Sequence, residues 1–229
     1  MDDRPAGGAR LAVLLHLCDS LFPTGGYAHS DGLEAATDGG RIVTGDDLRA
    51  WLAMLLDEVL SRGDGPAVLR AWHAANEQRW DDLRDLDDEV HALRPAATVR
   101  DASRGVGTRL LKTWGTLYPS DTVREVIARG PQWTLPVAFA VAALTAGVTA
   151  GASIEAFAYT RLSATASAAM RLMRLGQLEA HGVLAEVLVR VPEMAAGVLA
   201  RYDRPASFTP LADIAAMRQQ YVTTRLFRS

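Results

Sequence analysis

Apolar residues recur with helical spacing along nearly the whole chain, and this periodicity constrains the fold more than any other feature. In the clearest case they fall at i, i+3, i+4, i+7, i+8 and i+11, on one face of a helix: Leu48, Trp51, Leu52, Leu55, Leu56 and Val59. Runs with the period of two that half-buried strands show are almost absent. We therefore predict an all-α fold, a single-domain bundle of about ten helices over residues 1–229, with flexible segments at 1–9 and 222–229.

Capping residues predict where several of these helices begin and end. Thr44, Ser120 and Ser153 are typical N-caps, because their side-chain oxygens accept hydrogen bonds from free N–H groups of a first turn. We expect Gly63 to end the helix that follows Thr44, and Pro66 to start the next one. Proline at a first turn marks three further starts: Pro136, Pro192 and Pro210.

A stretch from Gly130 to Ile154 carries no charge and is long enough to cross a bilayer. It consists mainly of alanine, glycine and threonine, and Pro131 and Pro136 interrupt its start. We therefore interpret it as a buried core helix. The first ten residues carry four charges, two of them negative, unlike a signal peptide. These features predict a cytoplasmic protein without a membrane partner.

Composition excludes other classes of protein. Cys18 is the only cysteine, so no disulfide can staple the fold. The net charge of -3 is unlike the basic surface of a nucleic-acid-binding protein. An acidic run over residues 81–89 is interpreted as a solvated helix face, with docking of a basic partner as the alternative.

The motifs that mark an enzyme or a metal site are missing from the sequence. A phosphate-binding loop needs glycine-lysine-serine/threonine, yet the only lysine, Lys112, follows a leucine within a helical pattern. None of the five histidines forms an HExxH pair, and His16 and Cys18 are two residues apart, on different faces of a helix. We predict a non-enzymatic protein with no cofactor and no metal ligands.

Two segments look suited to contact with other proteins. The first is a Pro23-Thr24-Gly25-Gly26-Tyr27 turn running into Ser30-Asp31-Gly32-Leu33-Glu34, where Ser30 is expected to cap a short helix. The second is the end, Arg225-Leu226-Phe227-Arg228-Ser229, which combines apolar and arginine side chains that often anchor interfaces. We expect this end to be a partner anchor more than a fold element, so that its deletion barely changes the melting temperature.

These segments resemble the urease accessory protein family UreF. The resemblance extends to Pro210–Arg218, to Arg171-Leu172 with Leu175-Gly176-Gln177, and to Pro136-Val137-Ala138-Phe139-Ala140. It implies an all-helical, dimeric chaperone that binds UreD (also called UreH), recruits the GTPase UreG, acts on apo-urease and couples GTP hydrolysis to nickel insertion. The partner-binding residues so implied are Pro23, Gly25, Gly26, Tyr27, Ser30, Glu34, Arg171, Gln177, Arg218, Tyr221, Arg225, Leu226, Phe227 and Arg228.

Five positions depart from the family pattern. Gln219 and Gln220 stand where the family has His-Glu, Thr134 where it has histidine, and His29 and Asp31 lie in a changed Ser-Tyr-Ser-Gln. We expect these changes to remove polar groups near partner surfaces. The alternative functions are an all-helical, ligand-responsive transcription regulator, which would need a basic helix-turn-helix, and an enzyme with a helical active-site cavity.

Overall fold

The computed structural model describes residues 7–228, apart from the side chains of residues 7–9 and Tyr27, and these residues form helices and no strand. The part of the predicted flexible segment 1–9 before Gly7 lies outside the described residues. The first seven α-helices are α1 (Gly7–Leu17), α2 (Leu33–Asp38), α3 (Gly45–Met54), α4 (Gly65–Asn76), α5 (Trp80–Ala92), α6 (Ala97–Leu117) and α7 (Asp121–Ala128). The others are α8 (Leu135–Thr145), α9 (Ala150–Leu172), α10 (Gln177–Leu188), α11 (Val191–Arg201) and α12 (Pro210–Arg218). The predicted all-α class is confirmed.

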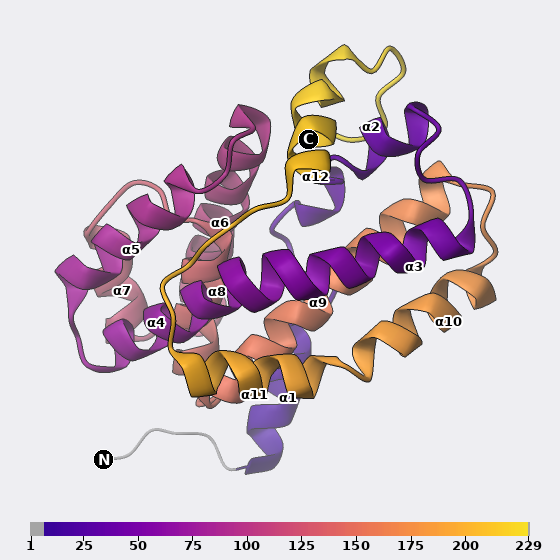
Figure 1. Ribbon diagram of the computed structural model, residues 1–229. Helices are drawn as coiled ribbons and strands as arrows, with labels where there is room; N and C mark the ends of the chain where they lie inside the picture. Colours follow the sequence, from indigo (N-terminus) through magenta and orange to yellow (C-terminus); the bar gives the residue numbers. More distant parts are fainter. Residues whose placement is uncertain (1–6, 229) are drawn as a thin grey trace.

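A nearly continuous helical rod crosses the molecule from α3 to α4 (Figure 1). It begins at Thr44, whose side chain forms a capping box with Asp47, as predicted. The expected helix end at Gly63 is wrong, because a π-helix (η2, Leu55–Asp64) runs through it and joins the two helices. Pro66 does lie in the first turn of α4, as predicted. The N–H of Gly65 donates to the carbonyl of Leu60, and a Cβ on Gly65 would lie 2.5 Å from that oxygen. Gly65 therefore permits the wide π-helical turn, and the helix continues through it.

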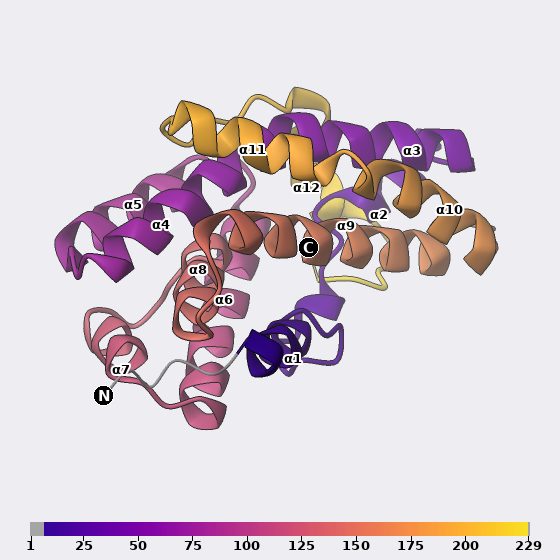
Figure 2. The ribbon, with the colours of Figure 1, turned by 90° about the horizontal axis from the view of Figure 1, so that it is seen from below.

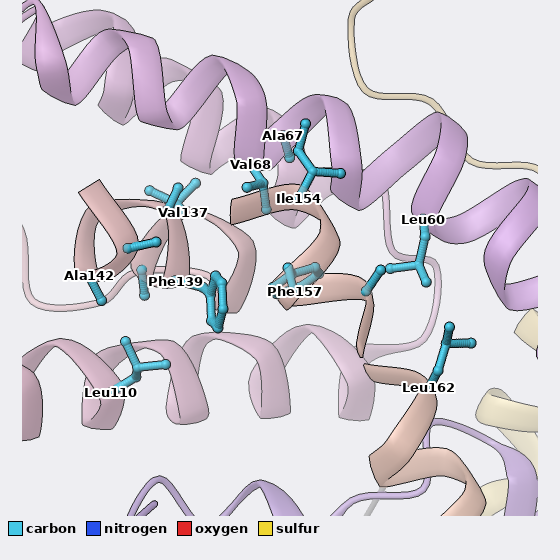
Figure 3. Close-up of a cluster of buried hydrophobic side chains, with 14 of the residues drawn as sticks. Leu60, Ala67, Val68, Leu110, Val137, Phe139, Ala142, Ile154, Phe157 and Leu162 are labelled. Atoms are coloured by element: carbon cyan, nitrogen blue, oxygen red, sulfur yellow. The ribbon is translucent and has the colours of Figure 1, made fainter. Parts of the chain in front are cut away.

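The core is organised around α8, the helix predicted from the uncharged stretch. Every residue from Pro136 to Ala143 is buried. Helices α4, α6 and α9 pack around it, and Figure 3 shows side chains of all four converging. The rings of Phe139 and Phe157 meet edge to face at 5.2 Å. None of the helices in the described part of the chain is long and apolar enough to span a membrane.

Helix α9 links this core to the rest of the molecule. In Figure 2 it lies between α3 and α11 on one side and α1 on the other. The predicted cap at Ser153 is wrong. Thr149 is the N-cap, and its Oγ1 accepts the N–H of Ala152 at 3.3 Å. Ser153 lies inside the first turn and donates its hydroxyl to the carbonyl of Thr149. Ser120 does cap α7, through the N–H of Val123.

One member of the acidic run on α5 departs from the predicted solvated face. Asp87 is 0% exposed and lies at the start of α8. Its Oδ1 accepts the N–H of Thr134 at 2.6 Å and the hydroxyl of Thr134 at 2.7 Å. The Arg104 guanidinium approaches Oδ2 at 3.5 Å. Burial raises the pKa of Asp87 above the usual range of an aspartate, against the opposing effect of these partners. The carboxylate thus fixes α5 against α8.

Replacing Asp87 tests this role. Asp87→Ala leaves both donors of Thr134 buried without an acceptor, and we expect a loss of about 1–3 kcal/mol in the free energy of unfolding. Asp87→Asn keeps an oxygen acceptor and should lose less.

The raised pKa of Asp87 also predicts the direction in which stability changes with pH. The folded protein holds this proton more tightly than the unfolded chain, so wild type should lose stability relative to Asp87→Asn as pH rises from the usual pKa of an aspartate toward neutrality. Urea unfolding of both proteins across this range measures the difference. A difference that grows in favour of wild type with rising pH would contradict the assignment.

Candidate partner-binding site

The two segments singled out in the sequence meet in space around one buried carboxylate. Glu34, near the start of α2, is 3% exposed. The backbone N–H of Leu226 donates to its Oε1 at 2.5 Å, and the N–H of Phe227 donates to Oε2 at 3.3 Å. The side-chain amide of Gln219 donates to the same carboxylate. We call residues 30–34 and 219–228 together the terminal clasp. Figure 1 shows the end of the chain beside α2 and α12.

Glycine is required at one point of the clasp. Gly32 has a φ of +89°, and a Cβ there would lie 2.7 Å from the backbone nitrogen of Ala216 on α12. A side chain would therefore be strained and would push α12 away. Helix α2 begins one residue later, at Leu33, and Ser30 accepts the N–H of Glu34 at 3.4 Å instead of standing directly at the cap.

The end of the chain packs on the protein's own core. Phe227 is 4% exposed and belongs to the main hydrophobic cluster. The Arg171 guanidinium lies 4.4 Å from the centre of its ring, and the N–H of Arg228 donates to the carbonyl of Ala28 at 2.7 Å. The expectation that Phe227 is a partner anchor more than a fold element is therefore wrong. The physical reason is that Glu34 satisfies the backbone of the segment and lets the ring be buried.

The other residues predicted to bind partners divide by exposure. Ser30 is buried with Glu34 and Phe227, while Gly25 and Gly26 are half-buried in the turn before η1 (Gly26–Ala28). Tyr27 belongs to η1, and its side chain lies outside the described residues. The exposed members are Pro23, Arg171, Gln177, Arg218, Tyr221, Arg225, Leu226 and Arg228.

The positions that depart from the family pattern are mostly internal. Gln219 and Thr134 are fully buried and donate to Glu34 and Asp87, respectively. Asp31 is half-buried and forms an ion pair with Arg161 of α9. Only Gln220 is exposed. The expectation that these changes alter partner surfaces is therefore wrong for Gln219 and Thr134, which are part of the fold.

A groove runs from the clasp between α1, α9 and α10. Its volume is about 480 Å³, and Phe227 forms part of its wall. Burial and the nearby charges of Arg109, Arg161 and Arg228 lower the pKa of His29 to about 4, and burial raises the pKa of Cys18 to about 11. Both side chains are therefore neutral at neutral pH. Within residues 7–228, no group of three histidine, cysteine or acidic side chains could hold a metal ion.

Sequence reasoning missed an apolar surface on α12. The alanines of this helix pack inward, and Ala215 and Ala216 are buried. Every third residue on the opposite side is apolar and exposed. Together with flanking residues these form what we call the α12 stripe: Phe208, Leu211, Ile214, Met217 and Tyr221. The spacing was readable in the sequence, but a stripe of this kind ordinarily predicts a core-facing side. Only the packing of the alanines shows that the larger side chains face outward.

The fold and this site define an all-helical scaffold, in which two terminal motifs hold an apolar helix face at the surface. The UreF family profile matches residues 42–188. The chain belongs to the UreF family of urease accessory proteins, which are non-catalytic and act in the maturation of the urease nickel centre. This finding replaces the transcription-regulator and enzyme alternatives. The matched stretch contains the α8 core, while the clasp and the α12 stripe lie outside it.

The requirement for glycine at residue 32 has a matched control elsewhere in the chain. Gly40 also has a positive φ, +68°, but a Cβ there would meet nothing within 4 Å. We expect Gly40→Ala to cost about 1–2 kcal/mol from backbone strain alone, and Gly32→Ala to cost more because it also displaces α12. Urea unfolding of both variants gives the comparison. Equal losses would show that the close approach of α12 is unimportant.

The packing of the chain end predicts a loss of stability on its removal. Phe227→Ala should lower the free energy of unfolding by about 3 kcal/mol, because it empties a buried site. Leu226→Ala is the control, since Leu226 is 55% exposed and should change stability by less than about 0.5 kcal/mol. Thermal melting of the isolated protein measures both. If Phe227→Ala melts like wild type, the ring does not pack on the core in solution.

Proposed function

We propose that this chain bridges a UreD/UreH-like protein and a UreG-like GTPase on apo-urease, and couples GTP hydrolysis to nickel insertion. The observation that carries the proposal is the UreF match over residues 42–188, which places the chain among urease accessory proteins. We further propose that it works in the cytoplasm as a homodimer. Its only lysine, Lys112, lies within α6 and not in a phosphate-binding loop, so the lysine that cradles the nucleotide phosphates must come from the GTPase.

The α12 stripe is proposed as the surface for the UreD/UreH-like protein. A row of five exposed apolar side chains is unusual on a monomer and is typical of a protein interface. Arg218 and Arg225, both exposed, lie close to it in the chain and offer forked donors to carboxylates or carbonyls. Apolar anchors bordered by arginine are the composition found at interface hot spots.

The clasp acts indirectly in this proposal. Glu34 and Phe227 hold the end of the chain against α2, and Gly32 lets α12 approach the same helix closely. The stripe is therefore presented from a fixed helix, so a partner does not have to order it on binding. Leu226 and Arg228, which follow α12 in the chain, are also exposed.

A charge placed in the stripe tests the surface. Ile214→Glu should abolish co-purification with the UreD/UreH-like protein, since a carboxylate would be buried without a partner in the interface. The variant should melt like wild type because Ile214 is already exposed. Val189→Glu is the matched control: Val189 is exposed at the end of α10, away from α12, and its substitution should leave co-purification unchanged.

The role in maturation is tested separately. In cells that lack their own UreF, the wild-type chain together with urease, UreD/UreH and UreG should restore nickel-loaded, active urease. Ile214→Glu should restore little activity, whereas Val189→Glu should restore it fully. Full activation by Ile214→Glu would exclude the stripe as the docking surface. Absence of activation by the wild-type chain with all partners present would contradict the proposed function itself.

A further inference from the structure

A polar hollow lies on the side of the molecule occupied by α4 and α5, formed by residues that belong neither to the clasp nor to the α12 stripe. Its volume is about 480 Å³. The α4–α5 hairpin forms two walls, and the connection from α11 to α12 forms the third through Tyr202 and Arg204. Figure 1 shows this connection leaving α11 and passing beside α4. A hollow of this size accommodates a metabolite-sized ligand.

Two of the three arginines in the hollow are already matched by carboxylates. Arg204 pairs with Glu89 at 3.0 Å. Arg79 pairs with Asp82, and with Glu77 at 2.8 Å. These pairs cancel most of the charge that the hollow presents.

Arg70 is different. It forms no ion pair or hydrogen bond with any residue in the described part of the chain, and its Nε is buried without a partner. Its guanidinium makes a cation–π contact with Tyr202, at 5.7 Å from the guanidinium carbon to the centre of the ring. A guanidinium carries five donors in a planar fork. A buried N–H without an acceptor is unfavourable, so Arg70 is the arginine of the hollow that lacks a partner.

The backbone holds Tyr202 over this arginine. Tyr202 ends α11 with φ +48° and ψ +41°, in the left-handed region that non-glycine residues rarely adopt. His73, one turn after Arg70 on α4, meets the Tyr202 ring edge to face, with 5.7 Å between the ring centres. Strained backbone of this kind clusters at ligand sites. Here it fixes the ring against one side of the guanidinium and leaves the donors of Arg70 as part of the wall of the hollow.

We propose that this hollow binds a small, polar oxyanion, a carboxylate or a phosphate monoester, whose oxygens accept from the guanidinium of Arg70. The planar fork of arginine matches both groups in a bidentate manner. Asp85, which also lines the hollow, is exposed and has no ion pair with a described residue. It disfavours a bare anion and favours a ligand that also carries hydroxyl or amine donors.

The experiment is a calorimetric titration of the full-length protein at low ionic strength, with citrate and, separately, with inorganic phosphate. The citrate arm reports a carboxylate ligand and the phosphate arm a phosphoryl ligand. We expect saturable binding of at least one probe at one equivalent per chain. Arg70→Met should weaken it by about tenfold or more, because a charged hydrogen-bond donor is lost. Arg70→Lys keeps the charge without the fork and should weaken it less.

Two further variants make the assignment specific. Arg79→Met removes an arginine of the same hollow that carboxylates already match, so it should change the affinity far less than Arg70→Met. Asp85→Asn removes the unmatched carboxylate and should strengthen binding by about two- to fivefold. Because Asp85 is exposed, this variant should fold even if Arg70→Met does not.

Three outcomes would overturn the proposal. The first is the absence of saturable binding of both probes to wild type. The second is binding that Arg70→Met leaves unchanged in a folded protein. The third is weaker binding by Asp85→Asn. These measurements require no urease protein, so their result is independent of the proposed function.

Discussion

Helix α8 has no polar face, and the positions of the other helices follow from the need to cover it. Its residues from Pro136 to Ala143 are mostly alanine and valine, so neighbouring helices approach closely on several sides. On one side, Gly107 of α6 makes this possible, because a Cβ there would lie 2.3 Å from the carbonyl oxygen of Trp133. The buried carboxylate of Asp87 fixes the start of the helix. The core therefore combines a small-residue helix with one polar anchor at its end.

A second buried carboxylate organises the periphery. Glu34 accepts two backbone N–H groups from the end of the chain and one side-chain amide from Gln219. A buried carboxylate is stable only when hydrogen-bond donors surround it. The end of the chain supplies these donors to Glu34, and Glu34 supplies the acceptor for its backbone N–H groups. The two motifs, nearly two hundred residues apart in the sequence, therefore depend on each other in the fold. It also places α12 on the body of the protein, with its apolar stripe directed outward.

The departure at residue 219 fits this arrangement. The family pattern has histidine there, whereas glutamine supplies the donor to Glu34 in this chain. An amide donates at every pH, while an imidazole changes its charge near neutrality. The donor that Gln219 supplies to Glu34 therefore carries no charge that changes with pH. Nearby, His29 is held neutral by burial and by three arginines, so it adds no charge at neutral pH.

The sequence by itself determined the helical class, the central place of α8 and most helix starts, because periodicity, proline and local caps act within a few residues. Thr44 and Ser120 are examples, since each caps a helix through its own next turn. It also singled out both halves of the clasp. Only the tertiary structure decided that the halves bind each other, that Phe227 is buried, and that Asp87 leaves the solvated face of α5. The same holds for the outward direction of the α12 stripe. Each of these depends on which groups from distant parts of the chain satisfy a buried charge or cover a ring, and local spacing contains no information about such partners.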